Sequence, residues 1–91
     1  MSSIVVEFFG IARHRALVPL AELPVDSPIT IAEVLQKLAE QIPSLVPDCI
    51  ADGQLSKYCA ANVNGDSFVT DSSISLQPSD RLLILSADAG G

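Results

Sequence analysis

The chain has 91 residues, 48% of them hydrophobic, which is enough for one modest core in a single domain. With 11 acidic and 5 basic residues the net charge is -6, which disfavours binding to nucleic acid or anionic lipid and favours a basic protein partner. No apolar run approaches the roughly 20 residues that span a bilayer, and the N-terminus MSSIVVEFFG lacks the basic segment of a secretion signal. We therefore expect one cytoplasmic domain, residues 1–91, with no membrane segment.

The first segments of the chain predict two strands. Residues 4–9, IVVEFF, are rich in β-branched and aromatic side chains, and alternation places Phe8 on the buried face and Glu7 and Phe9 on the opposite, solvated face. After Gly10 and the basic segment IARHR, residues 16–20 predict a second extended run that pairs with the first as a hairpin. Pro19 predicts that this second run is an edge strand.

Residues 31–42 carry the clearest periodicity in the sequence, because their apolar residues recur at the spacing of one helical face. Thr30 and Glu33 have the spacing of a capping box, and Ile29 and Val34 occupy the hydrophobic-staple positions. Pro43 ends the pattern. These signals predict one amphipathic helix with both boundaries defined.

The second half predicts an irregular connection followed by three strands. Residues 43–57 contain two prolines and a DG dipeptide and predict a loop with at most a short helical turn. Residues 58–63 and 67–69 predict a hairpin around an Asn-Gly turn at positions 64 and 65. After a turn at residues 78–80, a last strand places Leu82 and Ile84 on one face and Leu83 and Leu85 on the other.

The last strand is apolar on both faces, which is typical of a central strand with neighbours on both edges. The order strand, strand, helix, short strand pair, strand predicts an α+β fold that resembles a β-grasp (ubiquitin-like) fold. It would have a mixed sheet of four to five strands packed on one main helix, with the first and last strands parallel and adjacent. We expect residues 86–91, which end in Gly-Gly, to form a flexible C-terminal tail.

No constellation in the sequence predicts catalysis or metal binding. His14 is the only histidine and falls in the basic RHR segment, which we interpret as a solvated turn or a contact for an anionic group on a partner. Cys49 and Cys59 lack CxxC spacing and are expected to be inert, reduced thiols. The acidic residues in the predicted loops lack the spacing of a calcium loop and are expected on the surface.

The terminal Gly90 and Gly91 are the one feature of the sequence that suggests a chemical reaction. Without Cβ atoms, two glycines form a thin tail that can enter a channel closed to larger residues. The α-carboxylate of Gly91 has a pKa near 3.5 and is a poor electrophile, so it needs activation before a nucleophile attacks it. Activation as an acyl-adenylate would make the chain a carrier.

Four segments together resemble the ThiS/MoaD family of sulfur-carrier proteins over essentially the whole chain. These are VEFFGIAR, the helix ending QIPSL, DGQLSKYCAANVNGD and the closing LQPSDRLLILSADAGG. The longer MoaD-like members, which include the small subunit of molybdopterin synthase, are the most similar. Where many members have two prolines and a branched apolar residue before the glycines, this chain has Ser86, Ala87 and Asp88.

The resemblance implies that an E1-like enzyme adenylates Gly91, with Gly90 as its companion, using ATP, and that the terminus becomes a thiocarboxylate. It also implies a sulfur-accepting enzyme as a second partner, such as the large subunit of molybdopterin synthase. By the same resemblance, an apolar patch on the outer sheet face docks against partners. It comprises Phe9, Ala60, Leu83 and Leu85.

The chain is thus expected to be a carrier, or a small non-catalytic subunit of a sulfur-transfer enzyme, with no bound cofactor. Molybdopterin biosynthesis is the expected destination of the sulfur, with cysteine or thiamine biosynthesis as alternatives. A ubiquitin-like modifier that forms isopeptide bonds through Gly91 is a second possibility. A plain interaction domain with an incidental Gly-Gly end is the third.

Overall fold

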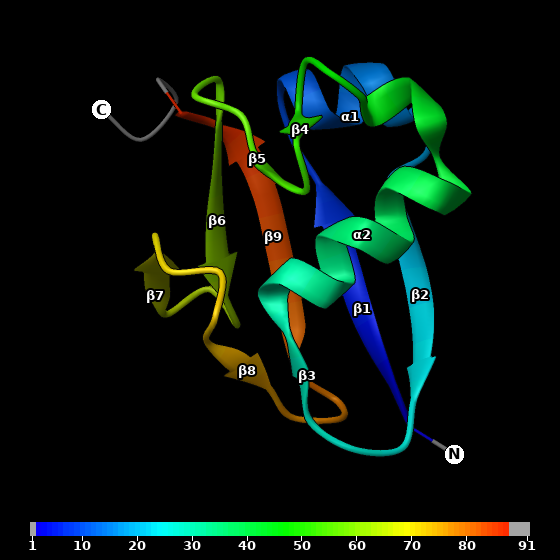
Figure 1. Cartoon of the computed structure of the whole chain (residues 1–91), viewed down its shortest axis with the longest axis vertical. Coiled ribbons are helices and arrows are strands. Elements are labelled where there is room, and N and C mark those ends of the chain that lie inside the picture. The colour runs from blue at the N-terminus through cyan, green and yellow to red at the C-terminus, as the bar shows by residue number, and fades with distance from the viewer. Residues whose placement is uncertain (1, 88–91) are drawn as a thin grey trace.

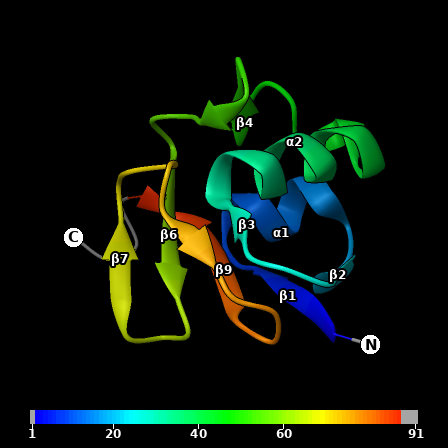
Figure 2. The same cartoon turned by 60° about the horizontal axis from the view of Figure 1, so that its bottom comes forward.

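The computed structural model describes residues 2–87, which form one mixed sheet with helices on one of its faces (Figures 1 and 2). The sheet has five strands in the order β2-β1-β9-β6-β7. Their bounds are β1 Ser2–Phe8, β2 Leu20–Val25, β6 Cys59–Val63, β7 Ser67–Val69 and β9 Arg81–Ser86. The main helix, α2 (Ile31–Gln41), crosses one face of the sheet, and the short helix α1 (Ile11–Ala16) lies at one end.

The centre of the sheet is the parallel pair β1 and β9, as the sequence predicts. Val5 pairs with Arg81 and Phe8 with Ile84, so the first and last strands run side by side although they are far apart in the chain. Leu82 and Ile84 are buried beneath the sheet with Phe8, whereas Leu83 and Leu85 are half-buried on the opposite face. The predicted alternation of the last strand is therefore confirmed.

Helix α2 begins at the predicted capping box. Thr30 Oγ1 accepts the Glu33 backbone N–H at 3.1 Å, and the Glu33 carboxylate accepts the Thr30 N–H at 3.1 Å. These bonds satisfy backbone donors that a helix start leaves free, and they lower the pKa of the exposed Glu33 carboxyl. The buried side of the helix consists of Ile31, Val34, Leu35 and Leu38.

The second strand is displaced from its predicted position, and the prediction of an extended run at residues 16–20 is wrong. The basic segment is not a turn but helix α1, in which Ala12 and Ala16, one helical turn apart, face the core. Leu17 ends the helix in the left-handed region (φ 65°), and the edge strand β2 starts only at Leu20. Strong local helix formers and a buried alanine pair thus override the extended pattern.

Five short elements complete the fold of the described residues, mostly where the sequence predicts irregular structure. Residues Pro43–Leu45 form the 3-10 helix η1. Strands β4 (Ile50–Ala51) and β5 (Gln54–Leu55) form a tight hairpin, because Asp52 and Gly53 both adopt positive φ, as a type I′ turn requires. Strand β3 (Ile29–Thr30) pairs with β8 (Ser75–Leu76) at the start of α2.

The predicted hairpin at Asn64-Gly65 joins β6 to β7. Asn64 and Gly65 have φ of 57° and 76°, and the Asp66 N–H donates to the Val63 carbonyl at 3.0 Å. The whole architecture confirms the predicted α+β class, with a mixed five-stranded sheet on one main helix.

Candidate docking surface and the base of the tail

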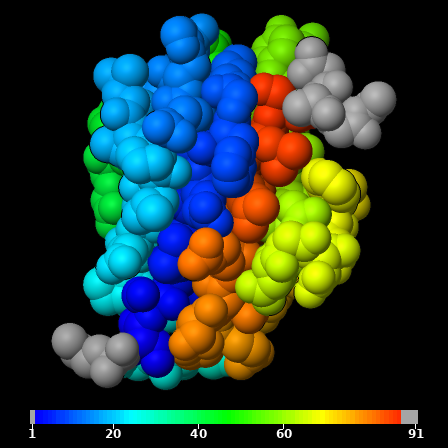
Figure 3. Space-filling model, turned by 180° about the vertical axis from the view of Figure 1, so that it is seen from behind, coloured from blue at the N-terminus to red at the C-terminus, as the bar shows by residue number. Residues whose placement is uncertain are grey.

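The sheet face turned away from α2 gathers the four residues that the family resemblance implicates in docking. Ala60 on β6 lies opposite Leu85 on β9, and Leu83 follows the same face of β9. Phe9 comes directly after β1, is 42% exposed, and donates its backbone N–H to the Ile84 carbonyl at 2.8 Å. Figure 3 shows this face, with β1 in blue beside β9 in orange and red.

Two further residues of this face are missing from the sequence-based prediction. Phe68 on β7 is 61% exposed and pairs with Asn62 on β6, which in turn pairs with Leu83. We call Phe9, Ala60, Phe68, Leu83 and Leu85 the outer-face patch. The alternation of the Asn-Gly hairpin predicts the side of Phe68, because the turn fixes the register of β7 against β6.

The outer-face patch is bounded on one side by an ion pair. Arg81 Nη1 lies 2.8 Å from the Glu7 carboxylate, and both side chains remain partly exposed to solvent. Exposed pairs of this kind contribute little stability, roughly 0 to 1 kcal/mol. The pair therefore limits the extent of the apolar surface rather than holding the sheet together.

Ser86 and Ala87, the first two residues of the expected tail, are fixed to the body by hydrogen bonds, and we call them the tail base. Ser86 is the last residue of β9, and its Oγ accepts the Ile11 backbone N–H at 2.8 Å. The Ala87 N–H donates to the Tyr58 carbonyl at 2.8 Å. The rest of the expected tail, with Gly90 and Gly91, lies outside the described residues.

Gly10 allows this close approach of β9 to the start of α1. It adopts φ 57° and ψ −130°, a conformation that side chains disfavour, and a Cβ at this position would overlap Ser86 Oγ. Beside the tail base lies an open hollow of about 300 Å³, lined by Ile11, Lys57 and Tyr58 together with Ser86 and Ala87. The tail base is therefore held at a defined position next to Leu85.

The basic residues of α1 lie at the same end of the molecule as the tail base (Figure 1). Arg13 and His14 are exposed, while Arg15 Nε bonds to the Asp48 carboxylate at 2.8 Å. His14, expected in a loop, lies on this helix. Among residues 2–87 there is no group of three or more side chains suited to hold a metal ion.

Cys49 and Cys59 are both buried and unpaired as disulfides. Burial raises the pKa of both thiols, that of Cys59 to about 12, so both are protonated at neutral pH. A protonated thiol is a weak nucleophile, and this agrees with the expectation of inert cysteines.

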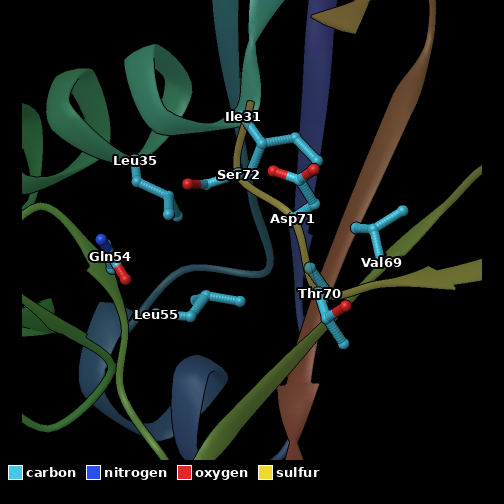
Figure 4. Close-up of a pocket in the computed structure, with 9 residues that line it drawn as sticks. Ile31, Leu35, Gln54, Leu55, Val69, Thr70, Asp71 and Ser72 are labelled. Atoms are coloured by element: carbon cyan, nitrogen blue, oxygen red, sulfur yellow. The ribbon is translucent and has the colours of Figure 1, made fainter. Parts of the chain in front are cut away.

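A smaller hollow lies between the start of α2 and the β6–β7 hairpin (Figure 4). It has a volume of about 80 Å³ and is lined partly by Ile31, Leu35, Leu55 and Val69, with Asp71 at its rim. Pockets for small-molecule substrates usually measure about 300 to 1,000 Å³. We assign this hollow no ligand.

No helix within residues 2–87 has the length and hydropathy needed to cross a membrane.

The topology and its comparison with solved structures define a ubiquitin-like β-grasp protein, as predicted. The structure is similar to SAMP1 from Haloferax volcanii (TM-score 0.81, 21% identity, 98% of this chain and 99% of that chain). It is also similar to SAMP1, the small archaeal modifier protein 1, from Methanosarcina acetivorans (TM-score 0.76, 23% identity, 100% and 98%). A putative molybdopterin converting factor subunit 1 from Pyrococcus furiosus has a TM-score of 0.73 at 13% identity, over 94% and 98%.

At these identities the similarity establishes the fold alone. The sequence itself matches the model of the ThiS family over residues 6–91. The chain therefore belongs to the ThiS family, which confirms the resemblance drawn from its motifs. No curated protein sequence matches it.

Proposed function

We propose that the chain is a sulfur carrier whose terminal Gly91 is activated by an E1-like enzyme. The observation that carries this proposal is the position of the outer-face patch: Leu85 directly precedes the tail base, so a protein docked on the patch lies beside the residues that lead to the terminus. Membership of the ThiS family, whose model extends to residue 91, supports the same function. The chain acts as a co-substrate in the cytoplasm and supplies no catalytic residue.

The proposed chemistry follows from the properties of a carboxylate. A Gly91 carboxylate oxygen attacks the α-phosphorus of ATP held by the partner enzyme, forming an acyl-adenylate and releasing pyrophosphate. Sulfide displaces AMP and leaves the thiocarboxylate directly. Alternatively, the outer sulfur of an enzyme persulfide displaces AMP to give an acyl disulfide, and a second thiol then attacks the enzyme's sulfur, which releases the thiocarboxylate and leaves a disulfide on the enzyme. Adenylation is needed because an ionised carboxylate resists nucleophilic attack.

The partners are an E1-like adenylating enzyme and a sulfur-accepting enzyme. The fold similarity to a putative molybdopterin converting factor subunit supports molybdopterin synthase as the acceptor and molybdopterin biosynthesis as the destination. Cysteine and thiamine biosynthesis are the alternative destinations. No cofactor is required on the chain itself.

Intact-mass measurement tests the proposal. The chain is incubated with ATP, a sulfur donor and the E1-like enzyme of the same organism, and the mass is expected to rise by the replacement of one oxygen with sulfur. A chain lacking Gly90 and Gly91 is the matched control and stays unmodified. An unchanged mass for the full chain with every E1-like enzyme of that organism would contradict the proposal.

A second candidate function, a ubiquitin-like protein modifier, is favoured by the similarity to two SAMP1 structures. In this case a lysine amine attacks the acyl-adenylate, or a thioester derived from it, and forms an isopeptide bond to Gly91. The same incubation, with cell extract added, separates the functions. Modification produces a ladder of larger conjugates that contain the chain, whereas sulfur carriage produces only the thiocarboxylate.

Leu85→Asp tests the role of the outer-face patch. Burial of a leucine against a partner contributes about 1.5 to 3 kcal/mol, so the variant should bind the E1-like enzyme at least about tenfold more weakly. Since Leu85 lies outside the core, the circular-dichroism spectrum should remain that of the parent. An unfolded variant would show that this leucine packs inward, and normal binding would exclude the patch as the docking surface.

A further inference from the structure

Asn62 lies in the middle of the outer sheet face, and the oxygen of its side chain has no hydrogen-bond partner among the described residues. It lies between Leu83 and Phe68 in the register of the sheet and is only 7% exposed. Its Oδ1 atom is fully buried and accepts no hydrogen bond from any residue that the structure describes. Buried polar atoms are nearly always bonded, and an unpaired one costs stability, so this atom needs an explanation.

The strand places this side chain among apolar neighbours of the outer-face patch. Ala61, the next residue towards the N-terminus, faces α2 and lines the hollow with Ile31 and Leu35, so alternation turns Asn62 to the outer face. A leucine there would fit the same surroundings and leave no unpaired acceptor. Burial of the carboxamide oxygen therefore does not stabilise the free domain.

Phe68 is the neighbour most able to uncover Asn62. It belongs to the three-residue edge strand β7 and is 61% exposed, so its side chain can change rotamer without disturbing the core. Leu83, on the other side, is half-buried in a central strand. A protein seated on the patch can thus displace the Phe68 ring and reach the Asn62 oxygen.

The charges near the tail base define the rest of the occupant. Lys57 lines the hollow beside Ser86 and Ala87, and the exposed Arg13 and His14 lie on α1 at the same end. The overall charge of the chain is nevertheless -6. A partner that suits this end carries acidic side chains there, whereas the net charge of the whole chain favours a basic partner elsewhere on the surface.

We propose that Asn62 Oδ1 accepts a hydrogen bond from the E1-like enzyme that receives the tail and fixes the position of that enzyme on the sheet. This inference rests on the proposed function. The occupant is a protein surface with apolar side chains over the patch, an N–H or O–H donor over Asn62, and acidic side chains facing Lys57. A donor enclosed by apolar contacts gives specificity, because a partner that lacks it leaves the acceptor unpaired.

The experiment compares folding and binding of the full-length Asn62→Leu variant. Denaturant melts should show a variant at least as stable as the parent, because it removes an unpaired buried acceptor. Titration calorimetry with the E1-like enzyme of the same organism should show binding about two- to tenfold weaker, as expected for one lost hydrogen bond. Asn62→Thr, which keeps a hydroxyl acceptor, should recover part of this loss.

Charge-reversal variants provide a second test of binding. Lys57→Glu should weaken binding most at low salt, whereas Lys37→Glu, the same change on the exposed side of α2, should leave it unchanged. The inference is overturned if Asn62→Leu binds as well as the parent, or if it is less stable. Leu85→Asp separates docking on the outer-face patch from the hydrogen bond to Asn62. If Leu85→Asp weakens binding while Asn62→Leu does not, the proposed function stands and only the role of Asn62 fails.

Discussion

Gly10→Ala should destabilise the domain through two separate effects at one position. The backbone of Gly10, at φ 57° and ψ −130°, is strained for any residue with a side chain, at a cost of about 1 to 3 kcal/mol. The added Cβ also overlaps Ser86 Oγ, which must move and lose its 2.8 Å bond to the Ile11 N–H, at a further cost of about 0.5 to 1.5 kcal/mol. The sum is roughly 1.5 to 4.5 kcal/mol.

Urea melts of a double-mutant cycle measure these effects. Ser86→Ala alone should cost only the hydrogen bond, because the variant loses the hydroxyl and keeps the Cβ, which lies 3.1 Å from the methyl that Gly10→Ala adds. The double variant should cost less than the sum of the single ones, since the hydroxyl that clashes is gone. A Gly10→Ala variant within about 0.5 kcal/mol of the parent would refute the reasoning, because strain and overlap would both be absent.

Two other predictions concern the helix cap and the buried thiols. Thr30→Ala should cost about 1 kcal/mol in urea melts. Because the folded state lowers the Glu33 pKa, the parent should lose the cap's contribution as pH falls below 4.5, and Thr30→Ala should lose less over that range. Since Cys49 and Cys59 have raised pKa values, unfolding titrations should show stability falling as pH rises above 9.0 towards 12, and iodoacetamide should label neither thiol at pH 7. Rapid labelling of the folded chain, or a cap variant as stable as the parent, would contradict the corresponding prediction.

The sequence is most informative where one local signal determines both boundaries of an element. The capping box predicts the start of α2, and the Asn-Gly turn predicts the β6–β7 hairpin, because both depend on chemistry within a few residues. It fails at α1 and β2. There the outcome depends on packing of Ala12 and Ala16 against the core, which a local pattern does not contain.

The residues of the candidate surface likewise include some that the sequence predicts and some that it does not. Alternation in the first and last strands predicts the outward positions of Phe9, Leu83 and Leu85 without any knowledge of the partner. Ala60 enters only through the family resemblance. The burial of Asn62 is not predictable from the sequence, since it results from the neighbours that β7 and β9 place on either side of it.

The parallel pairing of β1 with β9 has a consequence for how the molecule becomes competent to meet a partner. The pair joins residues separated by 76 positions (81 − 5), and because closing so long a loop costs more chain entropy than forming the local helix and hairpins, we expect it to form after them. Strand β9 also provides two of the patch leucines and the serine that anchors the tail. Under the proposed function, a chain still in the process of folding offers no assembled surface to an activating enzyme, and completion of the sheet would act as a checkpoint before ATP is consumed on its terminus.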